Sequence, residues 1–328
     1  MIKQTKLNKV VAKVRPYKKY QAPKPNNPLL PPLWFSMVSA SPKGAGKTYN
    51  TVQLLTAYEE SGFTFDGEKA VMRVMWFSAN TIHSKQNAIV KTLKTLDEED
   101  MYEITEKNNN IFEEVYQDIL AEKQEIEEYN IYRQIYKKFI KGGLTKLNDE
   151  ELLILEHHDY KDPKTDPDAP KYLVPRITFW ILDDLIGNKE VFSYRRGNYL
   201  NSLITRHRHD SPDLVPINLI FITQSFKAIP VIIRKNSDLF VLLKNANRKK
   251  VIEQISEEVG SILSEKDFEK YYDYICTIEH GALIINVHKD EALERRVRLG
   301  WDATLTLPSD KCDCISKGKP FGSCGKKE

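Results

Sequence analysis

Nearly continuous apolar runs alternate with amphipathic stretches along the chain. Six runs have the length and composition of strands that are buried on both faces of a parallel sheet. They lie at residues 33–39, 71–79, 177–182, 217–223, 239–243 and 282–287. Helical patterns separate several of them, for example at residues 200–206 and, behind a capping serine at position 264, at residues 267–277. The alternation predicts an α/β fold with a mostly parallel central sheet flanked by helices.

A long helical pattern interrupts this alternation between the second and third runs. One apolar stripe is Ile111, Val115 and Ile119, a second is Ile131 and Ile135, and two glycines at 142 and 143 end the run. We therefore expect a helical insertion. The predicted divisions are a basic, proline-rich N-terminal arm at 1–32, the first part of the core at 33–83, an acidic helical insertion at 84–171, the second part of the core at 172–307, and a C-terminal tail with cysteines and lysines at 308–328.

Charge is distributed unevenly along the chain, although 49 basic and 46 acidic residues leave a net charge of only +3. The first 24 residues hold eight basic residues and no acidic one. Residues 97–160 hold 18 acidic and 7 basic residues, a net charge of −11, so the remainder carries +14. That remainder favours a polyanionic partner, which the acidic stretch would repel.

Composition and cysteine usage exclude several classes of protein. A hydrophobic content of 41% and a charged content of 29% are globular values, and no apolar run is long enough for a spanning helix. The amino terminus lacks a signal-peptide pattern, so we expect an intracellular protein that is not secreted. Cys312, Cys314 and Cys324 lie in the tail without paired C-x-x-C halves, which favours free thiols over a zinc site.

The strongest local signal is a glycine-rich loop between the first apolar run and a helical pattern. Its residues are Ser41, Pro42, Lys43, Gly44, Ala45, Gly46, Lys47 and Thr48. Phosphate binding needs N–H groups at a helix amino end, glycines that allow close approach, a lysine on the outer phosphates and a hydroxyl on Mg²⁺. Lys47 and Thr48 supply the last two groups. The usual pattern has a glycine where this chain has Ser41, so the match is incomplete.

Two carboxylates, Asp183 and Asp184, follow the third apolar run. The carboxyl ends of parallel strands share one edge with the phosphate loop. We expect Asp183 to hold hydrated Mg²⁺, and Asp184 to orient the attacking water or accept its proton. An ordinary solvated strand end is the alternative for the pair alone. Together with the loop, however, the pair completes the set that phosphoryl transfer requires.

Gln224 follows the fourth apolar run, and arginines flank the same run. We expect Gln224 to hydrogen-bond the γ-phosphate or the attacking water, with an ordinary turn as the alternative. Arg206, Arg208 and Arg234 are candidates for an arginine that neutralises transition-state charge on a neighbouring subunit's nucleotide. A surface salt bridge is the alternative for each of them.

Several of these segments together resemble a known family. They are residues 36–48, 177–184, 206–209, 218–226 and 229–238. The chain resembles the genome-packaging ATPases of nucleocytoplasmic large DNA viruses and virophages, in the FtsK–HerA group of P-loop motors. The resemblance covers about residues 33–78 and 176–302, and Asp184 matches the aspartate that such viral members carry where many relatives have glutamate. Ser41, the long insertion and the cysteine tail depart from the family pattern.

The resemblance implies a RecA-like P-loop NTPase fold, ATP and Mg²⁺ as ligands, and a ring-shaped homo-oligomer. It also implies translocation of double-stranded DNA into a preformed capsid at a viral assembly site in the host cell, with a capsid or membrane-associated vertex protein as partner. Two alternatives remain open. One is a P-loop helicase or another DNA-dependent ATPase, and the other is a nucleotide-binding structural protein of the virion whose hydrolysis is vestigial.

Overall fold

The computed structural model describes residues 23–65, 67–79, 87–105, 110–185, 188, 191–192, 198–260, 262–288 and 291–307. Most of the expected N-terminal arm, and the tail with its three cysteines, lie outside these residues. Within the described part, no helix has the length and apolar content that crossing a membrane requires.

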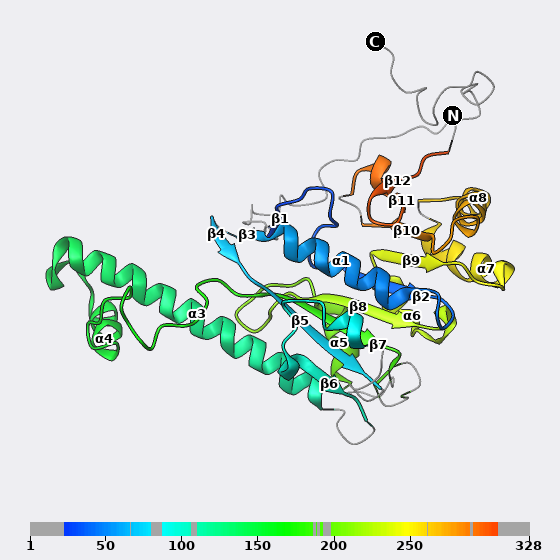
Figure 1. Ribbon diagram of the computed structural model, residues 1–328. Coiled ribbons are helices and arrows are strands. Elements are labelled where there is room, and N and C mark those ends of the chain that lie inside the picture. The colour runs from blue at the N-terminus through cyan, green and yellow to red at the C-terminus, as the bar shows by residue number, and fades with distance from the viewer. Residues whose placement is uncertain are drawn as a thin grey trace, which may run out of the picture.

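A central sheet of nine described strands organises the molecule (Figure 1), in the order β12-β11-β10-β9-β2-β8-β7-β5-β6. The parallel strands are β2 (Ser36–Ala40), β5 (Met72–Ser78), β6 (Met101–Glu103), β7 (Ile177–Asp183), β8 (Asn218–Thr223) and β9 (Leu239–Leu243). The antiparallel strands at one side are β10 (Ala282–Asn286), β11 (Val297–Leu299) and β12 (Ala303–Thr304). The sheet is therefore mostly parallel, as the sequence predicts.

A second, antiparallel sheet consists of three short strands. They are β1 (Lys24–Pro25), β3 (Phe63–Phe65) and β4 (Glu68–Ala70), in the order β1-β3-β4. The segment that leads from β1 into β2 is held by two arginines from the antiparallel side of the main sheet. Arg295 donates to the carbonyl oxygen of Pro28 at 2.7 Å, and Arg298 donates to that of Leu29 at 2.6 Å.

Helices cover both faces of the central sheet. They are α1 (Lys47–Ser61), α2 (Asn87–Val90), α3 (Ile111–Gly142), α4 (Asp149–His157), α5 (Tyr199–Arg206), α6 (Val231–Asn236), α7 (Arg248–Val259) and α8 (Glu265–Cys276). Short 3-10 turns occur at η1 (Glu98–Asp100), η2 (Leu144–Lys146), η4 (Phe226–Ala228) and η5 (Leu293–Arg295). Because alternate strand residues face opposite sides of the sheet, each face buries its own apolar cluster.

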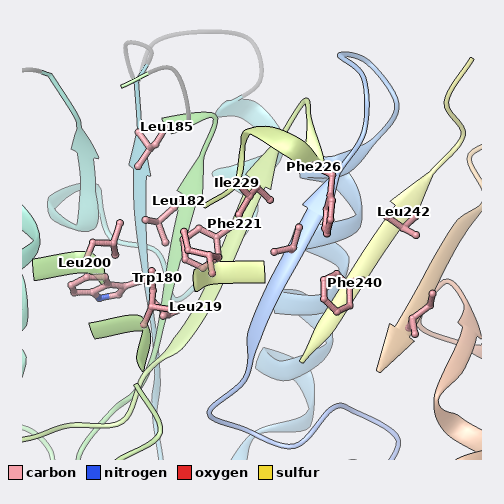
Figure 2. Close-up of a cluster of buried hydrophobic side chains, with 14 of the residues drawn as sticks. Trp180, Leu182, Leu185, Leu200, Leu219, Phe221, Phe226, Ile229, Phe240 and Leu242 are labelled. Carbon is pink, nitrogen blue, oxygen red and sulfur yellow. The ribbon is translucent and has the colours of Figure 1, made fainter. Parts of the chain in front are cut away.

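The larger cluster lies between the sheet and helices α3, α5, α6, α7 and α8. Figure 2 shows part of it, with Trp180 and Leu182 from β7, Leu219 and Phe221 from β8, and Phe240 and Leu242 from β9. The intervening residues of the same strands, Phe179 and Ile181 among them, pack on the opposite face against α1. Val52, Leu55 and Tyr58 form a buried stripe of α1. The result is a three-layer fold with the sheet in the middle.

Helix α3 belongs to two different environments along its 32 residues. Phe112, Val115 and Ile119 pack into the larger cluster of the sheet. Further along, Tyr129, Tyr132 and Ile135 pack instead against Leu155 of α4 and form a small separate core. We call residues 129–157 the helical hairpin, and it projects from the sheet at the left of Figure 1. An Asn148–Glu151 capping box starts α4.

Three details differ from the sequence predictions. Of the second predicted stripe of α3, Ile135 is buried as expected but Ile131 is 49% exposed, because Tyr129 and Tyr132 fill the other buried positions. The region predicted as a purely helical insertion also contributes β6 to the edge of the main sheet. Charge is the third difference, since residues 97–128 hold 13 acidic and 2 basic residues, whereas residues 129–160 hold 5 of each. The excess of acidic residues therefore lies before the hairpin in the sequence, and the hairpin itself has no such excess.

Candidate nucleotide-binding site

The predicted site residues come together at the carboxyl edge of the parallel strands. Strand register places Asp183 opposite Ile222, and Ala40 opposite Thr223. The residues that follow these strand ends therefore emerge side by side. The predicted phosphate loop, the paired carboxylates and Gln224 all belong to this edge, where ligands bind in open α/β sheets.

The phosphate loop enters α1 through two glycines in the left-handed region. Gly44 has φ of 78° and Gly46, the cap of α1, has φ of 101°. A side chain is strained at such angles. At Gly46 an added Cβ would meet only an ordinary contact, 3.5 Å from a methyl group of Leu243, so the backbone angle is what requires glycine. The first N–H groups of α1 have no acceptor within the helix, which suits them to bind phosphate oxygens.

Ser41 has a structural function that its place in the motif does not suggest. It is almost completely buried, its hydroxyl donates to the carbonyl oxygen of Ala40 at 2.5 Å, and its oxygen accepts the N–H of Leu243 at 3.0 Å. A glycine could not make these bonds. The hydroxyl of Ser41 thus joins the start of the phosphate loop to the end of β9.

Lys47 and the two carboxylates form one electrostatic group. The ammonium of Lys47 donates to the carbonyl oxygens of Ser41 at 2.6 Å and Pro42 at 3.0 Å. Burial lowers the pKa of Lys47, while the charges of Asp184 and Asp183 act in the opposite direction. Asp183 continues the alternation of Phe179 and Ile181 and so faces the α1 side of the sheet. Burial, together with the charge of Asp184, raises the pKa of Asp183 to about 6.

Asp184 lies in a left-handed backbone conformation with φ of 53°. Such conformations are uncommon outside glycine and cluster at functional sites. Its N–H donates to the carbonyl oxygen of Ile222 at 2.9 Å, which fixes it to β8. The side-chain amide of Gln224 donates to the Asp184 carboxylate at 2.6 Å. Gln224 and Asp184 are therefore in direct contact across the ends of β7 and β8.

The donor set at this edge fits Mg²⁺. Mg²⁺ prefers oxygen ligands and usually takes one or two protein carboxylates, completing its shell with water and substrate phosphates. Asp183 offers a carboxylate that is desolvated and lies beside a second carboxylate, an arrangement in which a bound cation favours the ionised form. The described residues contain no group of three or more metal-ligating side chains, which a Mg²⁺ site of this kind does not need.

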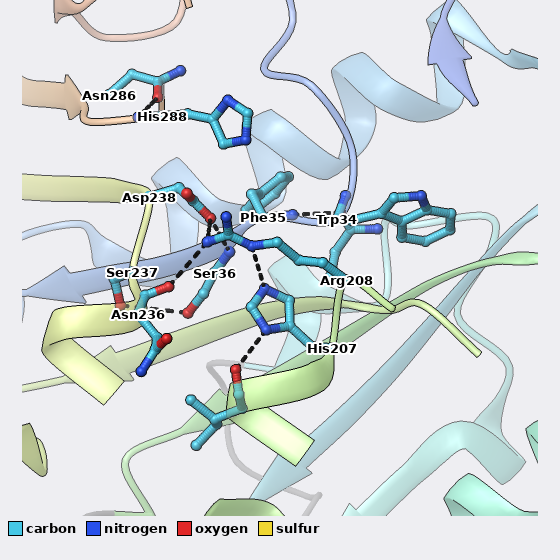
Figure 3. A network of polar contacts seen from close by, with 12 residues as sticks. Trp34, Phe35, Ser36, His207, Arg208, Asn236, Ser237, Asp238, Asn286 and His288 are labelled. Atoms are coloured by element: carbon cyan, nitrogen blue, oxygen red, sulfur yellow. Dashed lines mark hydrogen bonds and ion pairs between the residues drawn. The ribbon is translucent and has the colours of Figure 1, made fainter. Parts of the chain in front are cut away.

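Arg208 lies at the opposite, amino edge of the sheet (Figure 3). Its guanidinium donates to the Asp238 carboxylate at 2.7 Å, and that carboxylate also accepts the N–H of Ser36 at 3.0 Å. Asp238 precedes β9 and Ser36 begins β2, so the three residues join the amino ends of the two strands. Arg208 also donates to His207 at 3.4 Å. Within this chain, Arg208 is thus separated from the phosphate loop by the length of β2.

Arg234 and Arg206 also have partners within the chain. Arg234 donates to Glu258 at 3.0 Å and lies over the ring of Phe226, two residues after Gln224. Arg206 lies over the ring of Tyr199. Of the three candidate arginines, Arg234 has its guanidinium beside the segment that leaves the carboxyl edge.

Sequence reasoning did not include Lys244, which is exposed directly after β9. It lines a cavity with Ala45 of the phosphate loop and with the turn that follows α8. The signal was available, because the rule for strand ends that selects Asp183 and Gln224 selects Lys244 as well.

The fold and the site together define a P-loop NTPase fold of the RecA-like type, with a glycine-rich loop between β2 and α1 and two carboxylates at the end of β7. No protein-family model matches the chain, and no curated protein matches it. Solved structures do resemble it at low similarity. The genome packaging NTPase B204 from Sulfolobus turreted icosahedral virus 2 is 12% identical, with a TM-score of 0.42, and the match covers 81% of this chain and 95% of that one.

Two further proteins are similar at the same low level. The match to ATPases 2 and 3 of EssC from Geobacillus thermodenitrificans has 14% identity and a TM-score of 0.40, and it covers 84% of this chain and 41% of that one. The match to the pCW3 conjugation coupling protein TcpA has 13% identity and a TM-score of 0.38, and it covers 82% and 61% of the two chains. A viral packaging NTPase among these structures is of the kind that the sequence resembles, but such values are too low to bear on activity.

Proposed function

We propose that this chain is a Mg²⁺-dependent ATPase whose catalytic site is the carboxyl edge of β2, β7 and β8. The observation that carries the proposal is the convergence of Lys47, Asp183 and Asp184, whose charges influence one another, at the amino end of α1. A lysine, a helix amino end and a carboxylate for the metal are the parts that phosphoryl transfer uses for positioning and charge stabilisation.

Each residue then has a distinct function in the proposed reaction. Residues 41–48 bind the phosphates, with Lys47 on the outer ones, and Thr48 and Asp183 hold Mg²⁺, which when bound neutralises charge on the phosphates. Asp184 orients the attacking water and accepts its proton. Gln224, already hydrogen-bonded to Asp184, contacts the γ-phosphate or the same water. In this way β8 is linked directly to the state of the nucleotide.

We further propose that hydrolysis drives double-stranded DNA into a viral capsid and that the active form is a ring of identical subunits. The support is the sequence resemblance over residues 206–238, a far more specific segment than the phosphate loop. An arginine of the adjacent subunit, Arg234 or Arg208, completes the site. Subunits with Arg234→Ala, mixed with Lys47→Ala subunits, should recover part of the lost turnover, because each mixed interface can combine an intact loop with an intact arginine.

The decisive experiment is ATP hydrolysis by the purified chain with Mg²⁺, alone, with duplex DNA and with single-stranded DNA of equal length. A duplex-specific increase supports a translocase, and a larger increase with single strands supports a helicase. Turnover that neither DNA changes would remove the translocase proposal. Binding of ATP without any turnover would favour the structural virion protein.

A further inference from the structure

Helix α3 packs on the sheet with one face only along its first half. Roughly 18 residues make five turns of an α-helix, so residues at that spacing lie on the same face. Val115 and Ile119 pack into the larger cluster of the sheet, and at this spacing Arg133 and Lys137 continue the same face in the helical hairpin. There they line a cavity of about 350 Å³ instead of a packed core. This face of α3 is therefore covered at one end and open at the other.

The opposite face of α3 changes in the reverse sense. Tyr132 and Tyr136 belong to the small core that the hairpin forms with α4. Glu114 and Asp118 precede them by the same spacing of roughly 18 residues and are exposed. Helix α4 thus covers this face in the second half of α3 and leaves it open in the first half.

The open face of the first half carries negative charge. Its exposed carboxylates, which we call the acidic stripe, are Glu114, Asp118, Glu125 and Glu128. None of the four makes an ion pair with a described residue, whereas the neighbouring Glu122 and Glu127 do. The acidic stripe is therefore free to bind cations of another molecule.

The open face of the second half carries positive charge. Its cations, which we call the basic stripe, are Arg133, Lys137 and Lys141, and residues 129–148 contain five basic residues and no acidic one. Lys137 and Lys141 are exposed and have no ion-pair partner among the described residues, and Arg133 donates to the uncharged side chain of Asn130 at 2.9 Å. Ile140 beside them is 65% exposed and adds apolar surface.

The two stripes have opposite charge, but they cannot meet within one chain. They lie on one helix and are roughly 140° apart around its axis, as the average directions of their residues at 3.6 residues per turn show. A two-fold pair would place both stripes against the same neighbour, which requires both on one side of the helix. The stripes face two different neighbours instead, and this is the geometry of a head-to-tail contact, which generates a ring where the rotation closes.

We propose that the basic stripe of one copy of this chain binds the acidic stripe of the next copy, so that each helical hairpin overlaps the α3 of its neighbour (Figure 1). The inference rests on the proposed function for the assembly of identical subunits, but it does not depend on ATP hydrolysis. Exposed ion pairs are weak individually and are screened by salt, so association through these stripes should weaken as the salt concentration rises.

Charge reversal of either stripe tests the contact. One variant combines Lys137→Glu with Lys141→Glu, and the other combines Asp118→Lys with Glu125→Lys. In sedimentation of the full chain with Mg²⁺ and a non-hydrolysable ATP analogue at low salt, each variant should self-associate about tenfold more weakly or worse, because like charges then meet. Thermal unfolding of both variants should resemble that of the parent chain, since all four side chains are exposed.

A matched control and two rescues separate this contact from a general effect of charge. Lys266→Glu with Lys270→Glu places the same substitutions at the same spacing on exposed positions of α8, and this control should associate like the parent. A chain with both stripes reversed should regain about the affinity of the parent. The two single-stripe variants should also associate when mixed, because every contact between unlike copies then joins opposite charges.

The outcomes distinguish this contact from the proposed function. If the parent assembles and neither reversal weakens its assembly, or if the doubly reversed chain is not rescued, the contact is wrong and the ring uses other surfaces. Mixed variants that form only closed pairs would contradict the head-to-tail arrangement. Unchanged assembly with lower affinity for duplex DNA after reversal of the basic stripe would assign that stripe to DNA. A chain that stays monomeric at every salt concentration would remove the ring and this contact together, and ATP hydrolysis would stand separately.

Discussion

The two edges of the central sheet use polar residues in opposite ways. At the amino edge, Arg208, Asp238 and Ser36 satisfy one another across the starts of β2 and β9. At the carboxyl edge, Asp183 and Asp184 stand together beside a single half-buried lysine, and the pKa of Asp183 is raised to about 6. The first arrangement lowers the electrostatic energy of the folded chain, whereas the second leaves charge that a metal and phosphates can satisfy.

This contrast separates residues that hold the fold together from residues that act on a ligand. Substitutions at the amino edge should change stability first, and substitutions at the carboxyl edge should change turnover first. This division would be contradicted by an amino-edge substitution that changes mainly turnover, or by a carboxyl-edge substitution that changes mainly stability.

The largest expected effect is on turnover at the carboxyl edge. Asp184→Asn should lower the rate of ATP hydrolysis about 100-fold or more while leaving ATP affinity nearly unchanged, because the carboxylate is needed chiefly for water attack. Lys47→Ala should instead weaken ATP binding, since it removes a contact already made in the ground state. Calorimetric binding and steady-state turnover measure the two effects separately. Equal loss of binding in both variants would contradict this assignment.

A smaller effect on stability is expected at the amino edge. Arg208→Ala leaves the buried Asp238 carboxylate without its ion-pair partner and should lower the free energy of unfolding by about 2–3 kcal/mol, a value reduced for the partial exposure of Arg208. Urea denaturation measures it, with Lys227→Ala, an exposed site, as control. Unchanged stability with lost turnover would instead make Arg208 a catalytic residue, as the sequence analysis allowed.

His207 should make the amino edge sensitive to acid. Burial lowers the pKa of His207 to about 4, and the ring bonds to the carbonyl oxygen of Ile204 at 2.7 Å. Because the folded pKa lies below the unfolded value of about 6.5, the stabilisation is full above that value and is lost as pH falls toward 4. Between pH 7 and 5 the loss should be about 2 kcal/mol. Denaturation curves of His207→Gln should lack this component of the pH dependence, and equal slopes for both proteins would refute it.

The smallest expected effect concerns the link between the phosphate loop and β9. Ser41→Ala removes the acceptor of the buried Leu243 N–H and should lower the free energy of unfolding by about 1 kcal/mol. Ser41→Gly restores the usual loop residue but should be destabilised at least as much, because the bond is lost and the unfolded chain gains freedom. Thermal unfolding of the two variants measures this. A more stable glycine variant would mean that the bond contributes nothing.

The central strands were predictable because both of their faces are buried, and they therefore read as continuous apolar runs. The six predicted runs correspond to β2, β5, β7, β8, β9 and β10. Strands β6, β11 and β12 are only two or three residues long and carry mixed side chains, so no run marks them. In the hairpin part of α3, two tyrosines share the buried positions with Ile135, so a search for aliphatic stripes found Ile135 correctly but paired it with the exposed Ile131.

The site was predictable to the extent that strand ends locate residues. The rule for carboxyl ends correctly brought the phosphate loop, Asp183, Asp184 and Gln224 to one edge. The complementary rule places residues before a strand, such as Arg208 before β8, at the other edge, and the pairing of Arg208 with Asp238 depends on a tertiary contact that no local pattern contains. The hydrogen bond between the Ser41 hydroxyl and Leu243 could not be predicted either, because the two residues are 202 positions apart in the sequence.

The most direct test of the central claim is an experimental structure of the chain with Mg²⁺ and a non-hydrolysable ATP analogue. The phosphates should lie on residues 41–48, with Mg²⁺ beside Asp183 and the outer phosphate next to Asp184 and Gln224. A nucleotide bound at any other place, or bound at the loop with its outer phosphate directed toward β9, would contradict the account.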